Sequence, residues 1–332
     1  MKKISVCDLC GSSGLVPILS NIDRMQGAPG VFNLLKCRNC GLFRHSPQIE
    51  LKEINEYYPP KTYYSLKVSQ EKKTFIKKLG DHLYQVYFGE KQTFWRKFVF
   101  FPLRPLISTL PVVRKGRFLE VGCGAGDFLL RVKNLDMEVC GVEPGGFEPS
   151  FTQKLGLKIY NCDLKTCNFP KDYFDVIYLN HVFEHLADPT EHLRELKRIL
   201  KPGGKLVIAV PNIDSLAFRI FGKYWSYLDT PRHLYLFSSS TMKAYAKKTG
   251  LHINKLRYNS TPFQFFGSIF YLFNGVFRKN KYLKDSRLIN RMMKGQSLWL
   301  IVLFNLPWLP LVYFLNLIHQ GDAFEVLMNK ED

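Results

Sequence analysis

The fold of this chain is decided by the segment FLEVGCGAGD at residues 118–127. A short apolar run leads directly into three glycines at alternate positions, Gly122, Gly124 and Gly126, and a helical pattern follows. Glycine has no side chain, so a turn of this kind lets the backbone approach a ligand closely. The segment therefore predicts a buried strand, a ligand-binding turn and a helix, in that order.

The sequence around this segment alternates between two patterns. Apolar runs such as EVCGVEP, LKIYNCD, DVIYLN and KLVIAVPN are separated by stretches with helical periodicity. Strands separated by helices of this length are typical of a parallel sheet that is covered on both faces. We therefore expect an α/β core over residues 117–260. A composition of 46% hydrophobic and 23% charged residues excludes a wholly disordered chain.

Two acidic residues follow the glycine turn at the ends of predicted strands. Glu143 lies 17 residues after Gly126, where a carboxylate can accept both hydroxyls of a ribose. Asp163 ends the next strand and suits an exocyclic adenine amine. The G-x-G-x-G spacing differs from the dinucleotide pattern G-x-G-x-x-G, in which the third glycine lies at the helix start beside a pyrophosphate. This spacing weighs against a dehydrogenase.

Together with Lys201-Pro202-Gly203-Gly204 before the fifth strand, these features resemble the class I S-adenosylmethionine-dependent methyltransferases over roughly residues 115–260 and the last strand. The resemblance implies a Rossmann-like, doubly wound, mostly parallel seven-stranded sheet with an antiparallel last strand. It also implies that S-adenosylmethionine is the methyl donor. In the implied cofactor site, the methionine and ribose moieties border Glu120, Gly122, Gly124 and Gly126, Glu143 holds the ribose, and Asp163 with Leu164 frames adenine.

The end of the fourth strand carries the candidate base. Asn180 and His181 follow the apolar run and should face cofactor and acceptor, because strand ends border the ligand crevice in such sheets. Methyl transfer is an in-line displacement that requires alignment and removal of the nucleophile's proton. An imidazole suits that step near neutral pH. A histidine that only hydrogen-bonds the cofactor or caps the helix is the alternative.

Residues 181–185 also read H-x-x-E-H, a string found in zinc peptidases. We reject that interpretation because the string follows a sheet strand and no downstream acidic ligand is evident. The ubiquinone-pathway O-methyltransferases look similar here and have acidic and histidine residues that can bind a divalent ion. This chain has His181 where those have a carboxylate, which argues against metal dependence.

A third segment, Pro231-Arg232-His233-Leu234, resembles the acceptor-side loop of methyltransferases from glycan and natural-product pathways. The resemblance implies that Arg232 pairs with a substrate phosphate or carboxylate. It offers His233 as an alternative base. A purely structural loop is the competing interpretation, and the following helix should begin at a cap between residues 238 and 241.

The N-terminus has two cysteine pairs of the same design. Cys7 and Cys10 form one CxxC pair, Cys37 and Cys40 form the other, and a glycine follows each pair. Four thiolates suit a tetrahedral Zn²⁺ without an open coordination position, so we expect a structural zinc module over residues 1–45. Two independent redox or buried pairs are the alternative. The remaining four cysteines are expected to be packing residues: Cys123, Cys140, Cys162 and Cys167.

The charge balance and the start of the chain bear on partners and location. The 47 Lys and Arg against 28 Asp and Glu give a formal charge of +19, which favours a polyanionic partner. No apolar run follows Lys2 and Lys3, so a secretory signal is not expected and we predict a cytoplasmic protein. Residues 46–116 are interpreted as a basic, aromatic helical linker.

An apolar and basic helical insertion is expected over residues 261–320, before a closing strand over 321–332. Residues 298–318 carry no formal charge, but Pro307 and Pro310 interrupt them. With residues 263–277 and the basic stretch 278–294, they indicate contact with an anionic membrane at its inner face. A buried lid or an oligomer interface is the alternative, and a true transmembrane span fits less well.

These features predict a methyltransferase that acts on a sugar, a glycolipid precursor or a related small acceptor. The alternative is a ribosomal-RNA-type methyltransferase with an N-terminal zinc element, which the positive charge would suit. Against RNA, much of the excess charge lies beside apolar helices, and no N-P-P-[YF]-like motif follows the fourth strand. The sequence leaves open whether the acceptor atom is oxygen, carbon or nitrogen, and it leaves the oligomeric state open.

Overall fold

The computed structural model describes residues 1–49, 53–58, 75–90, 93–145, 152, 155–277 and 306–330. The basic stretch 278–294 and the first part of the apolar run 298–318 lie outside these described residues.

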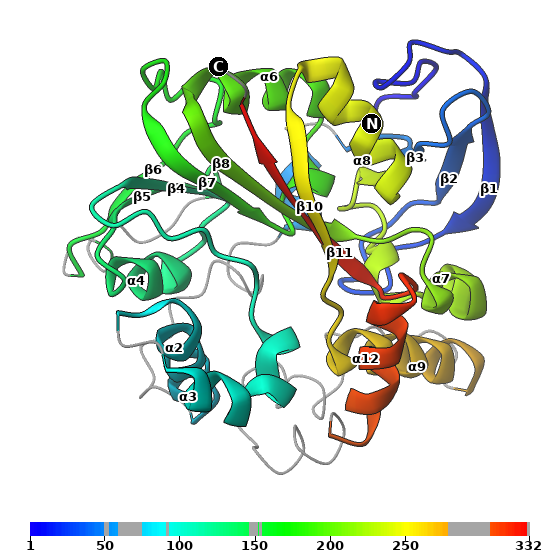
Figure 1. Cartoon of the computed structure of the whole chain (residues 1–332). Helices are drawn as coiled ribbons and strands as arrows, with labels where there is room; N and C mark the ends of the chain where they lie inside the picture. The colour runs from blue at the N-terminus through cyan, green and yellow to red at the C-terminus, as the bar shows by residue number, and fades with distance from the viewer. Residues whose placement is uncertain are drawn as a thin grey trace.

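A seven-stranded sheet forms the centre of the molecule, with the strand order β10-β11-β8-β7-β4-β5-β6 (Figure 1). The strands from β6 to β8 are mutually parallel, and β11 runs antiparallel to both of its neighbours. The expected sheet with a reversed last strand is therefore confirmed. Its strands are β4 (Arg117–Val121), β5 (Glu138–Val142), β6 (Lys158–Tyr160), β7 (Phe174–Asn180), β8 (Leu200–Pro211), β10 (His252–Tyr258) and β11 (Ala323–Asn329).

Helices cover both faces of this sheet. Neighbouring residues of β4 point to opposite faces: Leu119 belongs to the same apolar cluster as Leu193 of α6 (Pro189–Ile199) and Met242 of α8 (Ser239–Thr249). Phe118 belongs to the cluster of Leu129 in α4 (Asp127–Lys133), which also contains residues of α2 (Phe75–Phe88). This alternation explains why the strands are apolar throughout. The expected helix cap is confirmed at Ser238, whose side chain forms a capping box with Thr241.

The order of the strands locates the ligand crevice. The chain builds β5 and β6 on one side of β4, and β7 and β8 on the other side. In an open parallel sheet, ligands bind at the carboxyl ends of the strands where the strand order reverses. That point lies between β4 and β7, directly beside the glycine turn and the segment that begins at Asn180.

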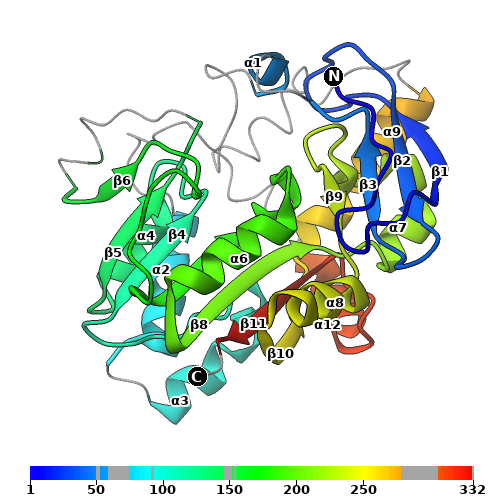
Figure 2. The same ribbon diagram turned by 90° about the horizontal axis from the view of Figure 1, so that it is seen from above.

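A second, antiparallel sheet contains three N-terminal strands, β1 (Leu15–Asn21), β2 (Phe32–Cys37) and β3 (Phe43–Ser46). Its fourth strand, β9 (Tyr235–Leu236), comes from the loop that follows His233 and pairs with β3. Figure 2 shows these N-terminal strands to one side of the central sheet, with α6 lying across β8. The loop that follows His233 is thus joined to the N-terminal sheet by backbone pairing between β9 and β3.

At the lower end of Figure 1, α3 lies on one side and α9 with α12 on the other. Among the described residues, none of the helices combines the length and the apolar character needed to cross a bilayer. The remaining elements are α1 (Ile54–Tyr57), α3 (Phe94–Val99), η3 (Phe101–Leu106), η4 (Phe183–His185), α7 (Leu216–Phe221), η5 (Gly222–Tyr224), η6 (Ser226–Leu228), α9 (Pro262–Phe277), η8 (Leu306–Trp308) and α12 (Leu309–Leu317).

Candidate active site

The glycine turn after β4 packs directly against the segment that follows β7. Gly122 has a φ of +71°, and a Cβ built on it would lie 2.3 Å from Cγ2 of Val182. No larger residue fits at this position without a shift, so Gly122 has a packing role as well as a conformational one. Because Val182 follows His181, the turn expected to hold the cofactor lies next to the candidate base.

Glu143 extends from the end of β5 to the same turn. One of its carboxylate oxygens accepts a hydrogen bond from the backbone N–H of Gly124 at 2.9 Å. The other oxygen accepts one from the backbone N–H of Gly145 at 2.9 Å. An ionised carboxylate offers about four acceptor positions, so Glu143 can still accept from two hydroxyl groups. Its geometry suits the ribose role that the sequence assigned to it.

Glu120, near the end of β4, is a buried acid with one unpaired oxygen among the described residues. It is 6% exposed, and its Oε2 atom has no hydrogen-bond partner among the described residues. Burial, and then the nearby charge of Glu143, raise the pKa of Glu120 well above its usual range. A protonated carboxyl group is a hydrogen-bond donor, and buried polar atoms in native proteins generally have partners. The unpaired oxygen therefore fits a polar group of a bound ligand.

The expected adenine-side residues lie in a short loop after β6. Asp163 is exposed, and its Oδ1 atom accepts a hydrogen bond from the backbone N–H of Lys165 at 3.0 Å. Leu164 is 2% exposed and packs within the main apolar cluster. A disulfide between Cys162 and Cys167 closes this loop. The expectation that these two cysteines act as separate packing residues is therefore wrong, whereas Cys123 and Cys140 are free thiols.

His181 lies directly after Asn180, an exposed residue at the end of β7, and is held by contacts on two sides. Its Nδ1 atom lies 3.3 Å from Oε1 of Glu184, and its ring stacks on Tyr227 with centroids 5.1 Å apart. Its φ of +53° is uncommon for a residue with a side chain, and such backbone conformations cluster at functional sites. The side chain remains 30% exposed, so a substrate can reach it.

Glu184 supplies a buried negative charge beside His181. Its side chain is fully enclosed, yet its pKa lies below the ordinary value. Burial alone would raise this pKa, but the hydrogen bond with His181 is the leading effect that lowers it. An enclosed carboxylate of this kind orients an imidazole and stabilises the imidazolium that forms when the ring takes a proton. The pair therefore has the geometry of a general base and its orienting acid.

Two further histidines lie around the same carboxylate. Ligand atoms of Glu184, His185 and His233 all lie within 4.8 Å of one another, and these are donor types that bind divalent ions. The Nδ1 atom of His233 lies 2.7 Å from the carbonyl oxygen of Tyr227. Burial, and then His185, lower the pKa of His233 well below its ordinary value, so its ring is neutral. His233 is 6% exposed and thus less accessible to a substrate than His181.

Sequence analysis missed Glu184, His185 and Tyr227 as members of this cluster. Two of them belong to the rejected H-x-x-E-H string, in which the useful signal was a carboxylate three residues after a histidine at a strand end. A contact with the far N-terminal part of the chain was also missed. The hydroxyl of Tyr58 lies 2.9 Å from Nδ1 of His185.

Arg232 does not have the expected role at a substrate anion. It is 1% exposed, and its guanidinium binds Asp23 with N–O distances of 2.9 and 3.0 Å and Asp229 at 2.6 Å. Although burial opposes it, the two carboxylates hold the pKa of Arg232 well above its ordinary value. Arg232 cannot bind a substrate anion here because its guanidinium is enclosed and its N–H groups point to these two acids, away from solvent.

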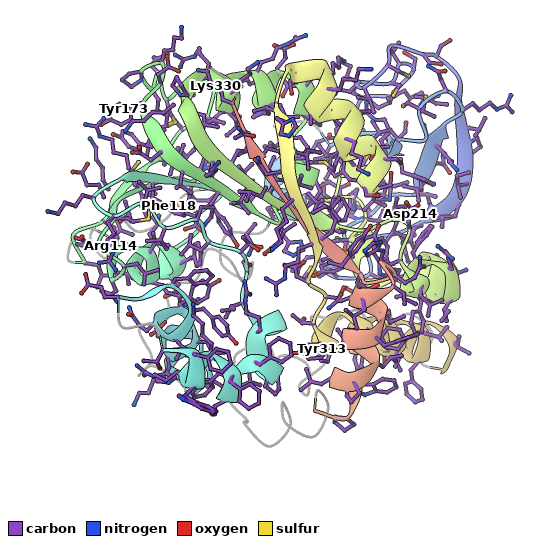
Figure 3. The ribbon with its side chains drawn as sticks, in the orientation of Figure 1. Arg114, Phe118, Tyr173, Asp214, Tyr313 and Lys330 are labelled. Carbon is purple, nitrogen blue, oxygen red and sulfur yellow. A yellow bond between two sulfur atoms is a disulfide. The ribbon has the colours of Figure 1, made fainter. Side chains whose placement is uncertain are left out.

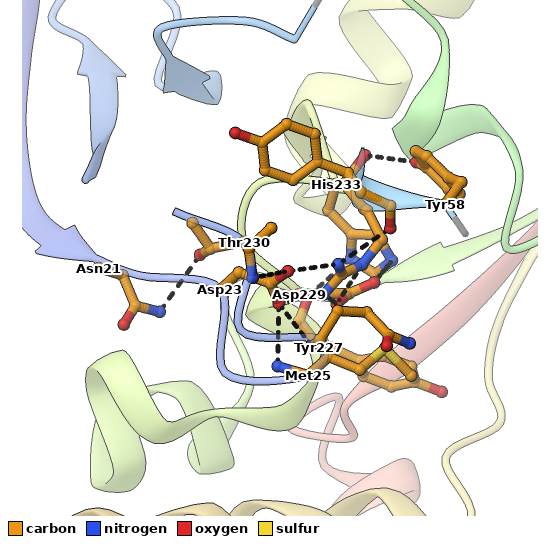
Figure 4. A network of polar contacts seen from close by, with 12 residues as sticks. Asn21, Asp23, Met25, Tyr58, Tyr227, Asp229, Thr230 and His233 are labelled. Carbon is orange, nitrogen blue, oxygen red and sulfur yellow. Dashed lines mark hydrogen bonds and ion pairs between the residues drawn. The ribbon is translucent and has the colours of Figure 1, made fainter. Parts of the chain in front are cut away.

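Figure 4 shows how the N-terminal module closes the back of the acceptor-side loop. Besides Asp23, the module contributes His45, whose Nδ1 lies 2.6 Å from the carbonyl oxygen of His233 and whose Nε2 lies 3.1 Å from the hydroxyl of Thr230. Burial lowers the pKa of His45 to about 4, so this ring is neutral. The loop that carries His233 is therefore held by buried polar contacts with residues of the N-terminal module.

The four N-terminal cysteines meet in one cluster. The sulfur atoms of Cys7 and Cys40 lie 3.5 Å apart, and those of Cys10 and Cys37 lie 3.6 Å apart. Tetrahedral zinc with Zn–S bonds of about 2.3 Å implies roughly 3.8 Å between sulfurs, so the cluster is compatible with zinc. The first knuckle is anchored to the core, because Asp8 accepts hydrogen bonds from Thr190 at 2.7 Å and Tyr245 at 2.9 Å.

Comparison with known proteins agrees with this geometry. A family model described as a methyltransferase domain matches residues 94–256. The chain contains a methyltransferase domain. This domain begins within the region that the sequence suggested to be a linker, and it spans the glycine turn, Glu143, His181 and the loop of Arg232 and His233.

Relatives of the methyltransferase domain act on different molecules. A tRNA U34 carboxymethyltransferase of Hydrogenovibrio crunogenus is 34% identical over 118 residues, which cover 31% of this chain and 34% of that protein. A ubiquinone biosynthesis O-methyltransferase of Rhodopseudomonas palustris is 28% identical over 159 residues, covering 42% and 63%. The chain spans between 34% and 51% of the length of three curated relatives that it matches.

The solved structures that resemble the chain include a SAM-dependent methyltransferase from Archaeoglobus fulgidus. It has a TM-score of 0.42 and 19% identity, and the match covers 75% of this chain and 99% of that one.

Proposed function

We propose that this protein transfers a methyl group from S-adenosylmethionine to a sugar, a glycolipid precursor or a related small acceptor. The observation that carries the proposal is the contact of Gly122 with Val182, which joins the glycine turn to the segment of His181. Glu143 is hydrogen-bonded to the same turn, and one buried oxygen of Glu120 has no partner among the residues that the structure describes. These residues fit a ligand that combines a ribose with an amino acid.

When bound, S-adenosylmethionine supplies an electrophilic methyl carbon on a sulfonium centre. His181 takes the proton of the acceptor's nucleophilic atom at Nε2, the ring nitrogen that does not face Glu184. Glu184, 3.3 Å from the opposite nitrogen, stabilises the resulting imidazolium. Tyr227 holds the plane of the ring by stacking, and its hydroxyl lies 3.4 Å from Nε2. His233 remains an alternative base in this proposal, because it adjoins the same carboxylate.

The surroundings of His181 favour a small acceptor over RNA. Arg232, the cation that the sequence assigned to a substrate phosphate, is enclosed by two carboxylates. Glu184 adds a further negative charge near His181, and neither arrangement favours an approaching phosphate backbone. The net charge of +19 still suits a polyanion elsewhere on the molecule. An RNA methyltransferase is therefore the second candidate, supported by the charge.

The experiment is a methyl-transfer assay with S-adenosylmethionine labelled at the methyl group. Nucleotide sugars, lipid-linked sugars and structured RNA are offered in parallel, and labelled products are identified by mass spectrometry. Our proposal expects label in a sugar or glycolipid product and none in RNA. Label in RNA alone would favour the second candidate. If the protein bound a nicotinamide dinucleotide in place of S-adenosylmethionine, both candidates would be rejected.

A further inference from the structure

An exposed apolar face lies on the helices at the lower end of Figure 1. We define this apolar face by six side chains: Phe94, Trp95, Phe98, Phe101, Phe314 and Leu317. The first four are 64–74% exposed, and the last two are 57% and 76% exposed. Soluble monomers rarely expose a contiguous set of large apolar side chains, and such sets usually mark a binding surface.

A contact between α12 and η3 brings the elements that carry these side chains together. The hydroxyl of Tyr313 in α12 donates to the carbonyl oxygens of Phe101, at 3.1 Å, and Pro102 in η3. Figure 3 shows Tyr313 at this end of the molecule. On the other side, Phe265 of α9 contacts Trp308 of η8, with ring centroids 5.5 Å apart. The apolar face therefore extends from α3 through η3 to α12, and the second contact joins η8 to α9.

In sequence, the elements that carry or adjoin the apolar face have charged residues of a single sign. Residues 94–106, 262–277 and 306–317 contain no Asp or Glu, whereas Arg96, Lys97 and Arg104 are among them. The sequence 278–305, which connects α9 to η8, contains seven basic residues and one acid. A second copy of the chain that docked here through the same surface would bring like charges together, because the segments 94–106, 262–277 and 306–317 contain no acid that could pair with them.

We propose that the apolar face docks on the surface of a lipid bilayer that contains anionic lipids. Trp and Phe side chains enter the interface between headgroups and acyl chains, and basic side chains bind lipid phosphates. Because α3 has only six residues, it lies in the interface and does not cross the bilayer. This inference goes beyond the proposed function, since lipid binding needs neither methyl donor nor acceptor.

The test is vesicle co-sedimentation of the full chain without donor or acceptor. Vesicles of phosphatidylcholine alone are compared with vesicles of phosphatidylcholine and phosphatidylglycerol. The double variant Trp95→Ser with Phe98→Ser should weaken binding to the anionic vesicles by about tenfold or more, because two aromatic side chains are no longer buried in the interface. Binding should fall with salt but keep an apolar component, because burial of aromatic side chains is not screened.

The matched control is Ile18→Ser with Val31→Ser, which removes two exposed apolar side chains from the N-terminal module. It should bind vesicles as the unchanged protein does. Thermal unfolding of both double variants should match the unchanged protein, since all four side chains are exposed. The proposal is overturned if anionic vesicles are not bound, or if both double variants bind equally well. It is also overturned if Trp95→Ser with Phe98→Ser only converts an oligomer into a monomer.

Discussion

Arg232 and Asp23 form a fully enclosed ion pair, with a shortest N–O distance of 2.9 Å between residues 209 positions apart. The pair joins the N-terminal module to the loop that carries His233. A buried ion pair is weak evidence for stability in itself, but loss of one partner leaves an uncompensated charge. The N-terminal module thus contributes buried polar partners to this loop of the methyltransferase domain.

Asp23→Ala should therefore lower the free energy of unfolding by about 3 kcal/mol, because Arg232 remains buried with Asp229 as its remaining carboxylate partner. Chemical denaturation measures this change. The control is Glu138→Ala, which removes an exposed partner of Arg117 and should cost less than about 1 kcal/mol. Equal small losses in both variants would mean that the buried pair has no special role.

Removal of the metal should loosen the N-terminal module and leave the donor site intact. We expect one equivalent of zinc by elemental analysis, lost in Cys37→Ser but retained in Cys140→Ser, whose thiol lies outside the cluster. Protease cleavage within residues 1–45 should increase only in Cys37→Ser. Affinity for S-adenosylmethionine should persist, because Glu120, Glu143 and its partner Gly124 all belong to the methyltransferase domain. A metal-free protein with a protease-resistant N-terminus would contradict the zinc assignment.

The pair of His181 and Glu184 should control turnover more than binding. His181→Ala should reduce kcat by about 10²–10⁴-fold, the usual contribution of general base catalysis. Glu184→Gln, which keeps the shape and removes the charge, should also reduce kcat, because the imidazolium loses its partner. His252→Ala removes an exposed histidine in β10 and serves as the control. If His233→Ala alone abolished turnover, the base would be the other histidine.

The buried carboxyl group of Asp322 should make the free energy of unfolding depend on pH. Burial raises its pKa to about 7, above its ordinary value of 3.8. Between these two pKa values the folded state binds the proton and the unfolded state does not, so stability falls as pH rises from about 4 to 7. The total change is about 4 kcal/mol. Asp322→Asn should flatten this part of the curve in denaturation measured across pH, and an unchanged slope would show that Asp322 titrates normally.

Short sequence motifs could be assigned to their place in the fold from the sequence alone. The glycine turn, Glu143 and the CxxC pairs could be interpreted because each is a short pattern whose chemistry depends on neighbouring residues. The seven-stranded sheet could be predicted because strands buried on both faces are apolar throughout.

Contacts between distant segments could not be predicted in this way. Nothing near Arg232 in the sequence indicates that Asp23 encloses it, so the arginine resembled an exposed anion-binding residue. Likewise, the contact of Glu184 with His233 forms only in the fold, where Oε1 of Glu184 lies 3.8 Å from Nε2 of His233. The disulfide of Cys162 was missed because its partner, five residues away, has no motif spacing.

The most direct test of the central claim is a calorimetric titration of the protein with S-adenosylmethionine, with Glu143→Ala and Glu138→Ala in parallel. We predict one binding site in the unchanged protein, affinity weakened by about 1–3 kcal/mol in Glu143→Ala through lost hydrogen bonds to a charged acceptor, and unchanged affinity in Glu138→Ala. Equal affinity in all three proteins, or tighter binding of a nicotinamide dinucleotide, would contradict the account.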